Sequence, residues 1–272
     1  MKKLMQWMMA AILICGATVF TSCNNDDNPV NPTDNLSEKI IGKWITAEFN
    51  GQPQTTDNKV VLNFVSDTKA FLSASFFDHP KLSDLWNVQT EYAVVISGNK
   101  VTLTNKIDEH QTIIIVLVVN SITSKEIQTV MKNTLIVDGQ EISSPEMPIN
   151  FKKITRDYDE AILGLWECTG LKGGETFNDA NARLEFFEDG TYNYFRKNDA
   201  GEWEVVTTRE FQEYFVDGTL LATRWKNTDE DELREWWEIK SLKGDKMQWK
   251  SLRANEDGTT FEQIMDWERV EE

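Results

Sequence analysis

The sequence predicts an all-β fold of two tandem antiparallel meander β-barrels, and three observations lead to this class. Gly42-Lys43-Trp44 recurs 122 residues later as Gly164-Leu165-Trp166. Two further blocks keep a similar offset: residues 62–67 with 184–189, and residues 121–128 with 241–248. Matching blocks in one order indicate a duplicated domain. Turn signals every 8–15 residues, with β-branched and aromatic runs between them, indicate a meander of strands.

The first 22 residues predict a cleaved targeting segment. Two lysines supply a positive start, and a mostly apolar run follows from Trp7 to Phe20. That run is 14 residues long, whereas about 20 are needed to span a bilayer, so a cleaved signal is expected rather than a membrane anchor. Phe20-Thr21-Ser22-Cys23 resembles the lipobox of bacterial lipoproteins. The resemblance implies that Cys23 becomes the first mature residue and carries acyl chains that anchor the protein.

Residues 23–35 predict a flexible tether that begins at the acylated cysteine. Asp26 and Asp27 lie in an Asn-Asn-Asp-Asp cluster that resembles an export signal for lipoproteins on the outer face of the outer membrane of some Gram-negative bacteria. Val30 is the only clearly apolar side chain between residues 24 and 35, which is too little apolar surface to fold. We therefore expect a lipid-anchored outer-membrane protein that faces the cell exterior, on a tether with a reach of about 20 Å.

The rest of the chain predicts two domains, over residues 36–155 and 156–272. With Cys23 acylated, Cys168 is the single remaining thiol, so no intramolecular disulfide is expected. The first domain holds 11 basic and 13 acidic side chains and the second holds 15 and 29, which gives net charges of −2 and −14. This acidity excludes nucleic acid as a partner. The acidic run at residues 229–232 lacks the spacing of a calcium loop, so we expect a solvated surface and no metal.

Six strands are expected in order along the first repeat, at residues 59–65, 70–77, 88–96, 100–106, 111–122 and 126–132. Residues 113–119 are apolar on both faces, so another part of the chain, such as the second domain, is expected to cover the outward face. Residues 139–148 contain two prolines and have no counterpart in the second repeat.

The second repeat predicts eight or nine strands separated by tight turns. Asp189-Gly190 and Asp217-Gly218 each lie between two β-rich segments, and Asp-Gly favours the type I′ turn of a two-residue hairpin. A meander leaves two exposed edges, and closing it into a barrel removes both. Residues 36–40 and 157–161 each precede a Gly-x-Trp motif and are expected to form one helical turn.

A helical turn, a Gly-x-Trp motif opening the first strand and a hairpin meander together resemble the lipocalin-like (calycin) group. In that group the tryptophan closes one end of an eight-stranded barrel, and a basic side chain from the last strand packs over it. The resemblance implies barrel-closing roles for Gly42, Trp44 and Lys153 in the first repeat and for Gly164, Trp166 and Arg269 in the second. Lys153 departs from the family pattern because lysine lacks the planar guanidinium that stacks on an indole ring.

The sequence carries little catalytic material, so we expect no enzyme and no cofactor. The nucleophile-elbow, zinc-protease and phosphate-loop motifs do not occur in it. His79 and His110 are the only histidines and lack the spacing of a metal pair. Cys168 alternates with Trp166 on one strand face, which favours a core thiol over a nucleophile. A glycosidase pair of carboxylates distant in sequence stays open as an alternative.

Seven of the ten tryptophans lie in the second repeat, and their alternation along strands assigns them to faces. Glu235 and Trp237 share an inward face, whereas Trp236 lies among charged neighbours and is expected to face outward. Inward tryptophans either fill the barrel or line a pocket that has polar groups. The expected contacts of such a pocket are Tyr192, Tyr194, Arg196, Trp225 and Glu235, with Trp236 as a surface contact.

These features predict a surface lipoprotein that is held to the membrane by its lipid anchor and binds without catalysis. The expected partner is a small or apolar ligand in a barrel mouth, or an envelope protein on the surface. Two alternatives stay open, namely a glycan-binding accessory protein that stacks sugar rings on exposed tryptophans, and a structural subunit of an envelope assembly.

Overall fold

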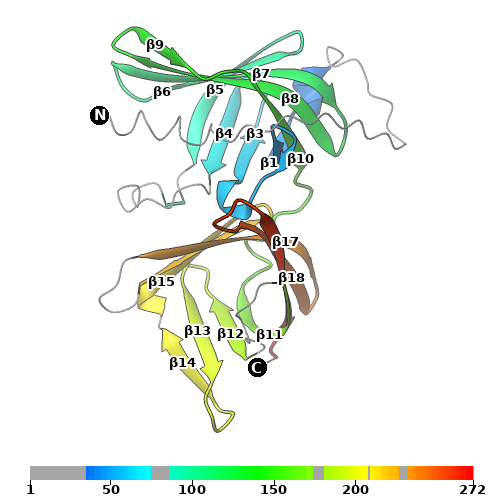
Figure 1. The fold of residues 1–272 in the computed structure, drawn as a ribbon, viewed down its shortest axis with the longest axis vertical. Helices are drawn as coiled ribbons and strands as arrows, with labels where there is room; N and C mark the ends of the chain where they lie inside the picture. The colour runs from blue at the N-terminus through cyan, green and yellow to red at the C-terminus, as the bar shows by residue number, and fades with distance from the viewer. Residues whose placement is uncertain are drawn as a thin grey trace. The chain divides into compact units, whose positions relative to one another are not determined.

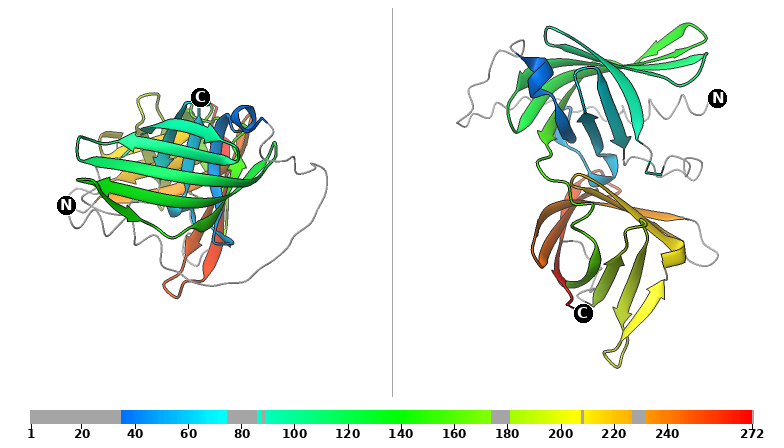
Figure 2. Two further views of the ribbon diagram at one scale, coloured as in Figure 1. Left: turned by 90° about the horizontal axis from the view of Figure 1, so that it is seen from above. Right: turned by 180° about the vertical axis from the view of Figure 1, so that it is seen from behind.

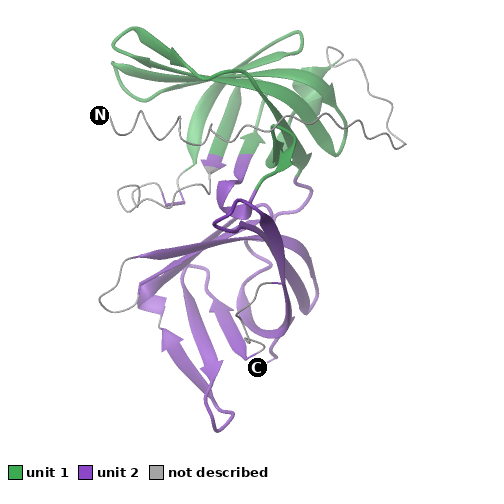
Figure 3. Ribbon diagram, viewed as in Figure 1, with its two compact units in different colours: residues 1–54, 62–72, 89–153 green, residues 55–61, 73–88, 154–272 purple. Residues whose placement is uncertain are grey.

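The computed structural model describes residues 35–271 apart from residues 75–85, 88, 174–180, 208 and 227–231. Cys23, Asp26, Asp27 and His79 lie outside the described residues. The chain divides into two compact units, of which unit 1 comprises residues 1–54, 62–72 and 89–153, and unit 2 comprises residues 55–61, 73–88 and 154–272 (Figure 3). Two segments of the first repeat therefore belong to unit 2.

Unit 1 contains a closed ring of eight antiparallel strands (Figure 1). Its elements are α2 (Leu36–Lys39), β1 (Gly42–Phe49), β2 (Gln52–Pro53), β3 (Val60–Phe64), β4 (Lys69–Ala74), β5 (Thr90–Ser97), β6 (Lys100–Lys106), β7 (Gln111–Ile122), β8 (Glu126–Val137), β9 (Gln140–Ser143) and β10 (Met147–Lys153). The ring closes because β10 pairs with both β8 and β1. The strands β5 to β8 run side by side, as two further views show (Figure 2).

Unit 2 contains a nine-stranded antiparallel sheet that is curled into a nearly closed barrel. Its elements are η1 (Thr56–Asn58), β11 (Gly164–Lys172), β12 (Ala182–Phe186), β13 (Tyr192–Lys197), β14 (Trp203–Thr207), η3 (Arg209–Phe211), β15 (Gln212–Asp217), β16 (Leu220–Trp225), β17 (Leu233–Lys243), β18 (Lys246–Ala254) and β19 (Thr260–Arg269). The order runs β14-β13-β12-β11-β19-β18-β17-β16-β15. An isolated bridge between Thr191 and Glu213 joins the two sides of the remaining opening.

The two barrels share their β-bulges as well as their strand order, which confirms the prediction of tandem antiparallel barrels. In the first strand of each barrel the register shifts after Thr46 and after Cys168, positions that are 122 residues apart. The long hairpin of each barrel has a second shift, after Val119 in β7 and after Ile239 in β17, which are 120 residues apart. Because a bulge bends its strand, these two shared positions place bends at the same points of both barrels.

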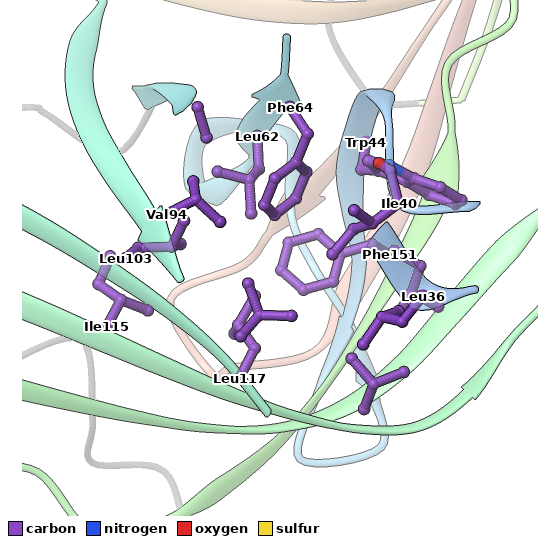
Figure 4. Packing of buried hydrophobic residues seen from close by; sticks show 14 of the residues in the cluster. Leu36, Ile40, Trp44, Leu62, Phe64, Val94, Leu103, Ile115, Leu117 and Phe151 are labelled. Atoms are coloured by element: carbon purple, nitrogen blue, oxygen red, sulfur yellow. The ribbon is translucent and has the colours of Figure 1, made fainter. Parts of the chain in front are cut away.

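The interior of unit 1 is filled by apolar side chains (Figure 4). Trp44, Phe64, Leu117 and Phe151 are buried and converge there with aliphatic neighbours from most strands of the ring. The cavity among them has a volume of about 10 Å³, and its lining is apolar apart from Thr129. A space of this size admits about one water molecule at most, so the first barrel has no room for a small-molecule ligand there.

The outward residues of β7 are less exposed than their sequence suggests. Ile114, Val116 and Val118 are half-buried. Ile114 lies between Thr104 and Thr134 on the neighbouring strands, while Val116 and Val118 have lysine, threonine or valine beside them. The aliphatic parts of such neighbours shield part of the face, so the expected cover by another domain is not needed to half-bury it.

The expectation that Trp236 faces solvent is wrong, because its side chain is only 7% exposed. The outer face of β16 and β17 is apolar around it, with Leu220 and Ala222 fully buried. The short helix η1, a segment of the first repeat, packs against β17 and β18 within unit 2. Its Thr56 hydroxyl oxygen accepts a hydrogen bond of 2.9 Å from the Leu252 amide.

Candidate functional site

The Gly-x-Trp motif of each barrel begins its first strand and meets a cation from the last strand. The indole Nε1 of Trp44 donates to the Ile40 carbonyl at 2.6 Å, and that of Trp166 donates to the Ile162 carbonyl at 2.6 Å. The Lys153 ammonium lies 4.1 Å from the centroid of the Trp44 ring. The guanidinium carbon of Arg269 lies 4.2 Å from the centroid of the Trp166 ring. Both tryptophans are therefore held by a hydrogen bond and a cation–π contact.

The two closures differ in how many carbonyl groups the cation binds. Arg269 donates to the Leu163 carbonyl at 2.5 Å and to the Ala161 carbonyl at 3.0 Å, whereas Lys153 donates to the Ile41 carbonyl. Burial also lowers the pKa of Lys153. The planar guanidinium thus makes a more extensive closure in unit 2, in keeping with its fork of donors.

Glycine is required beside each cation. Gly42 and Gly164 have φ angles of +113° and +103°, which other residues rarely adopt. A Cβ atom would lie 2.7 Å from the Lys153 Nζ at Gly42 and 2.7 Å from an Arg269 nitrogen at Gly164. The motif therefore supplies both the backbone turn and the space for the cation.

The closed end of the second barrel leads into a stack of buried aromatic rings. Trp249 and Trp267 have ring centroids 4.5 Å apart, and Trp237 lies 5.8 Å from Trp249. Phe186 and Tyr192 belong to the same core. The indole Nε1 atoms of Trp249 and Trp267 are buried and have no hydrogen-bond partner among the described residues. The tryptophans thus fill this part of the barrel and place two donors in its core.

Farther along the same strands the inward side chains become polar. On β18 the inward series from Met247 and Trp249 continues with Ser251 and Arg253, and on β17 Trp237 is followed by Glu235 toward the same end. The polar layer, as we call it, consists of Thr223 on β16, Glu235 on β17, Arg253 on β18 and Gln263 on β19. It therefore spans four adjacent strands of the sheet.

The polar layer is joined by hydrogen bonds. Arg253 pairs with Glu235 and donates from Nε to the Gln263 side-chain oxygen at 2.9 Å. The Thr223 hydroxyl donates to the Glu235 carbonyl at 3.4 Å. The Arg253 guanidinium also lies 5.0 Å from the Trp237 ring centroid. Thr223 and Gln263 are buried, whereas the Glu235 and Arg253 side chains are each 31% exposed, so the layer reaches solvent.

Phenol groups adjoin this layer, and their ionisation is suppressed. Burial, the Glu235 charge and the nearby Tyr194 raise the pKa of Tyr192, against a hydrogen bond with Thr223 that lowers it. Burial raises the pKa of Tyr214 to about 12, with the charges of Asp189 and Asp159 adding to the shift. Both phenols therefore remain neutral hydrogen-bonding groups at ordinary pH.

The same layer of the first barrel is mostly apolar. The matched bulges and registers align Leu103 with Thr223, Ile115 with Glu235, and Met147 with Gln263. Asn133 aligns with Arg253 and is the polar exception. The barrel thus closes with apolar side chains at these places, and the fold itself does not demand the ion pair of the second barrel.

The sequence-predicted contacts fall into three groups. Glu235 and Tyr192 lie at the polar layer, and the half-buried Tyr194 packs against the adjoining core. Arg196 is exposed near the end of β13, and Trp225 is half-buried at the end of β16. Trp236 lies on the opposite face of β17 from Glu235 and does not join them.

Sequence reasoning missed Thr223, Arg253 and Gln263. A signal for two of them existed, because the alternation that places Leu221 and Trp249 inward also places Thr223 and Arg253 inward. The missing information was the register, which decides the residues that lie opposite each other on neighbouring strands.

The described part of the chain lacks the side-chain groupings of several other kinds of site. No group of three or more histidine, cysteine or acidic side chains there has the arrangement to hold a metal ion. His110 forms an exposed pair of 2.9 Å with Asp138, and Cys168 is a buried free thiol. Among the described helices, none has both the length and the apolar character needed to cross a membrane.

Comparisons with known proteins give little further information. No family model matches the chain, and no curated protein matches it. A crystal structure of a DUF3598-family protein of unknown function from Nostoc punctiforme is similar over 89% of this chain and 99% of its own length. Its sequence identity to this chain is 11% and the TM-score is 0.23.

Proposed function

We propose that this protein is a lipid-anchored, non-enzymatic binding protein that holds a small polar ligand at the polar layer of its second barrel. The observation that carries the proposal is the contrast between the duplicated barrels. The second barrel has Glu235, Arg253 and Gln263 where the first has Ile115, Asn133 and Met147. Burying even part of an ion pair costs desolvation and does not by itself favour stability, so the presence of this half-buried pair in one copy supports a role in recognition.

The composition of the layer favours an uncharged, hydroxyl-bearing ligand. The Arg253 and Glu235 charges offset each other, so the site offers little net charge to an ion. Guanidinium, carboxylate, amide and phenol groups provide donors and acceptors beside the Trp237 ring. Ligand sites commonly combine an aromatic surface with a few such polar groups. A small sugar has this combination of hydroxyl groups and a face that stacks on an aromatic ring. The layer therefore favours a sugar over the apolar ligand that was also expected.

The cellular setting of this proposal depends on the N-terminal residues. Acylation of Cys23 would anchor the protein in the outer membrane, and Asp26 and Asp27 would direct it to the cell exterior. The short polar tether would then let the second barrel meet ligands in the surrounding medium. A role in binding an envelope partner or as a structural subunit is the competing outcome.

The test exchanges the charged pair of the second barrel for its counterpart in the first. A Glu235→Ile, Arg253→Asn double variant removes both charges together and avoids leaving one unpaired. Binding of mono- and disaccharides is followed by quenching of tryptophan fluorescence, with an apolar dye as the comparison ligand. A matched control, Glu91→Ile with Lys69→Asn, removes an exposed ion pair from the first barrel.

We expect saccharides to quench the wild type and the control, and the double variant to bind at least about tenfold more weakly, which is about 1.4 kcal/mol. The proposal is wrong if the double variant binds saccharides as the wild type does, or if only the apolar dye binds to the wild type. Far-UV circular dichroism and protection of the Cys168 thiol establish that the variant is folded.

A further inference from the structure

The second barrel lacks continuous strand pairing between β13 and β15, at the place where β4 and β5 of the first barrel are paired. In unit 1, β4 and β5 pair through four positions, from Lys69 opposite Ala93 to Leu72 opposite Thr90. When the two barrels are aligned by their shared bulges, the Lys69–Ala93 pair of unit 1 corresponds to the Thr191–Glu213 pair of unit 2. There the pairing is a single isolated bridge, and β13 continues by pairing with β14 instead. The duplicated architecture can therefore close at this point, and the second copy does not.

As a result β14 is an edge strand. Within the described residues it pairs with β13 on one side, and at its end the Thr207 carbonyl accepts a hydrogen bond of 2.7 Å from the Gln212 side chain. Figure 1 shows β14 beside β13 at the end of the sheet. Alternate backbone N–H and C=O groups of an edge strand point away from its single neighbour and are available to another strand.

The side chains of this edge are apolar where edge strands usually carry protection. Val205 and Val206 are 50% and 52% exposed, and Phe211 in η3 is 49% exposed. β14 contains neither proline nor lysine, the residues that commonly block pairing at an edge. Glu204 is its one charged residue, and it accepts a hydrogen bond of 2.6 Å from Asn198.

The segment that forms the edge carries more acidic than basic side chains. Residues 202–213 contain four carboxylates, at Glu202, Glu204, Glu210 and Glu213. Arg209 is the one basic side chain in this segment, and it is ion-paired with Asp189. Glu213 is ion-paired with Arg224, and Arg196 on β13 lies opposite Glu204, which leaves Glu202 and Glu210 as the carboxylates open to a partner. A second copy of this acidic chain would bring like charges to the contact, whereas a basic segment would complement it.

We propose that β14 is a docking strand for an extended, basic segment of a partner protein, which adds to the sheet and places apolar residues over Val205, Val206 and Phe211. Backbone hydrogen bonds to the β14 edge would supply affinity, and lysine or arginine side chains beside Glu202 and Glu210 would supply selectivity. This surface is separate from the polar layer, so the proposal holds whether or not a small ligand binds there.

The experiment measures binding of short synthetic peptides to the mature full-length protein by fluorescence anisotropy. The probe alternates lysine with valine and threonine and has blocked ends. One comparison peptide has glutamate in place of lysine, and another has alternate backbone amides N-methylated, which removes donors and leaves the side chains. The protein variants are Val206→Lys, and Val95→Lys as a control, since Val95 is 64% exposed on β5, a strand paired on both sides.

We expect the lysine peptide to bind the wild type and the Val95→Lys control alike, and to bind Val206→Lys at least about tenfold more weakly. The glutamate and N-methylated peptides should lose binding to the wild type by a similar factor, a result that needs no protein variant. Equal binding of the N-methylated peptide would overturn strand addition. Absence of peptide binding together with a concentration-dependent dimer that Val206→Lys abolishes would instead make a second copy the occupant and overturn the proposal.

Discussion

Two tryptophans of the second barrel should respond differently to the same substitution. Trp166 and Trp267 are both buried and lie on the adjacent strands β11 and β19. The Trp166 N–H donates to the Ile162 carbonyl, whereas the Trp267 N–H has no partner among the described residues. Replacing either by phenylalanine removes the same atoms and keeps an aromatic ring, so the loss of apolar burial is similar in the two variants.

The difference in the free energy of unfolding between the two variants therefore reports whether the indole N–H has a hydrogen-bond partner. Trp166→Phe loses a hydrogen bond and leaves the buried Ile162 carbonyl without that donor, at a cost of about 1–3 kcal/mol, and it weakens the cation–π contact with Arg269. Trp267→Phe removes a buried donor whose desolvation costs about 1–3 kcal/mol. Adding the two effects, Trp166→Phe should destabilise unit 2 by about 2–6 kcal/mol more than Trp267→Phe does.

The buried thiol provides the assay. In a chain that begins at Asn24, Cys168 is the only cysteine, and it lies in the core of unit 2. Its labelling by a thiol reagent as a function of urea reports unfolding of this unit separately from unit 1. With a urea dependence of about 2 kcal/mol per molar, the midpoints of the two variants should differ by about 1–3 M. Midpoints that coincide, or a lower midpoint for Trp267→Phe, would refute the reasoning.

Two other predictions concern the anchor and the phenols. Changing Cys23 to Ala should release the protein from membranes, because acylation at this residue is the expected anchor, and fractionation would contradict this if the variant stayed with the membranes. Burial raises the pKa of Tyr214 to about 12, so above pH 10 the unfolded chain ionises first and the free energy of unfolding of unit 2 falls as pH rises toward 12. The Tyr214 contribution should approach about 1.4 kcal/mol per pH unit, and a Tyr214→Phe variant should show a shallower decline in urea midpoint, whereas identical declines would contradict the assignment.

The sequence predicted the duplication and most strands because both depend on local patterns. The strand expected at residues 111–122 is β7, and that expected at residues 100–106 is β6. The hairpin formed by the end of β8 and β9 was missed, since the region was interpreted as an insertion rather than as strands. Its turn at Asp138 and Gly139 has positive φ at both residues, which is the Asp-Gly signal recognised elsewhere in the chain.

The candidate site was predicted in part. Alternation along β17 placed Glu235 inward, but it could not show that Arg253 and Gln263 lie level with it on the next two strands. The prediction for Trp236 was wrong for a related reason. Its face was assigned from charged neighbours in β17, whereas the residues buried beside it, Leu220 and Ala222, come from β16. Pairing between strands and cover by distant segments are not local properties of the sequence.

The packed tryptophans of the second barrel have a spectroscopic consequence. Trp249 lies 4.5 Å from Trp267 and 5.8 Å from Trp237, distances at which neighbouring indole transitions couple and excitation passes between rings. The coupled rings should give unit 2 an exciton signature in circular dichroism and a depolarised emission. The packing of the unit 2 core can thus be followed by circular dichroism and fluorescence in the intact protein, without any attached label.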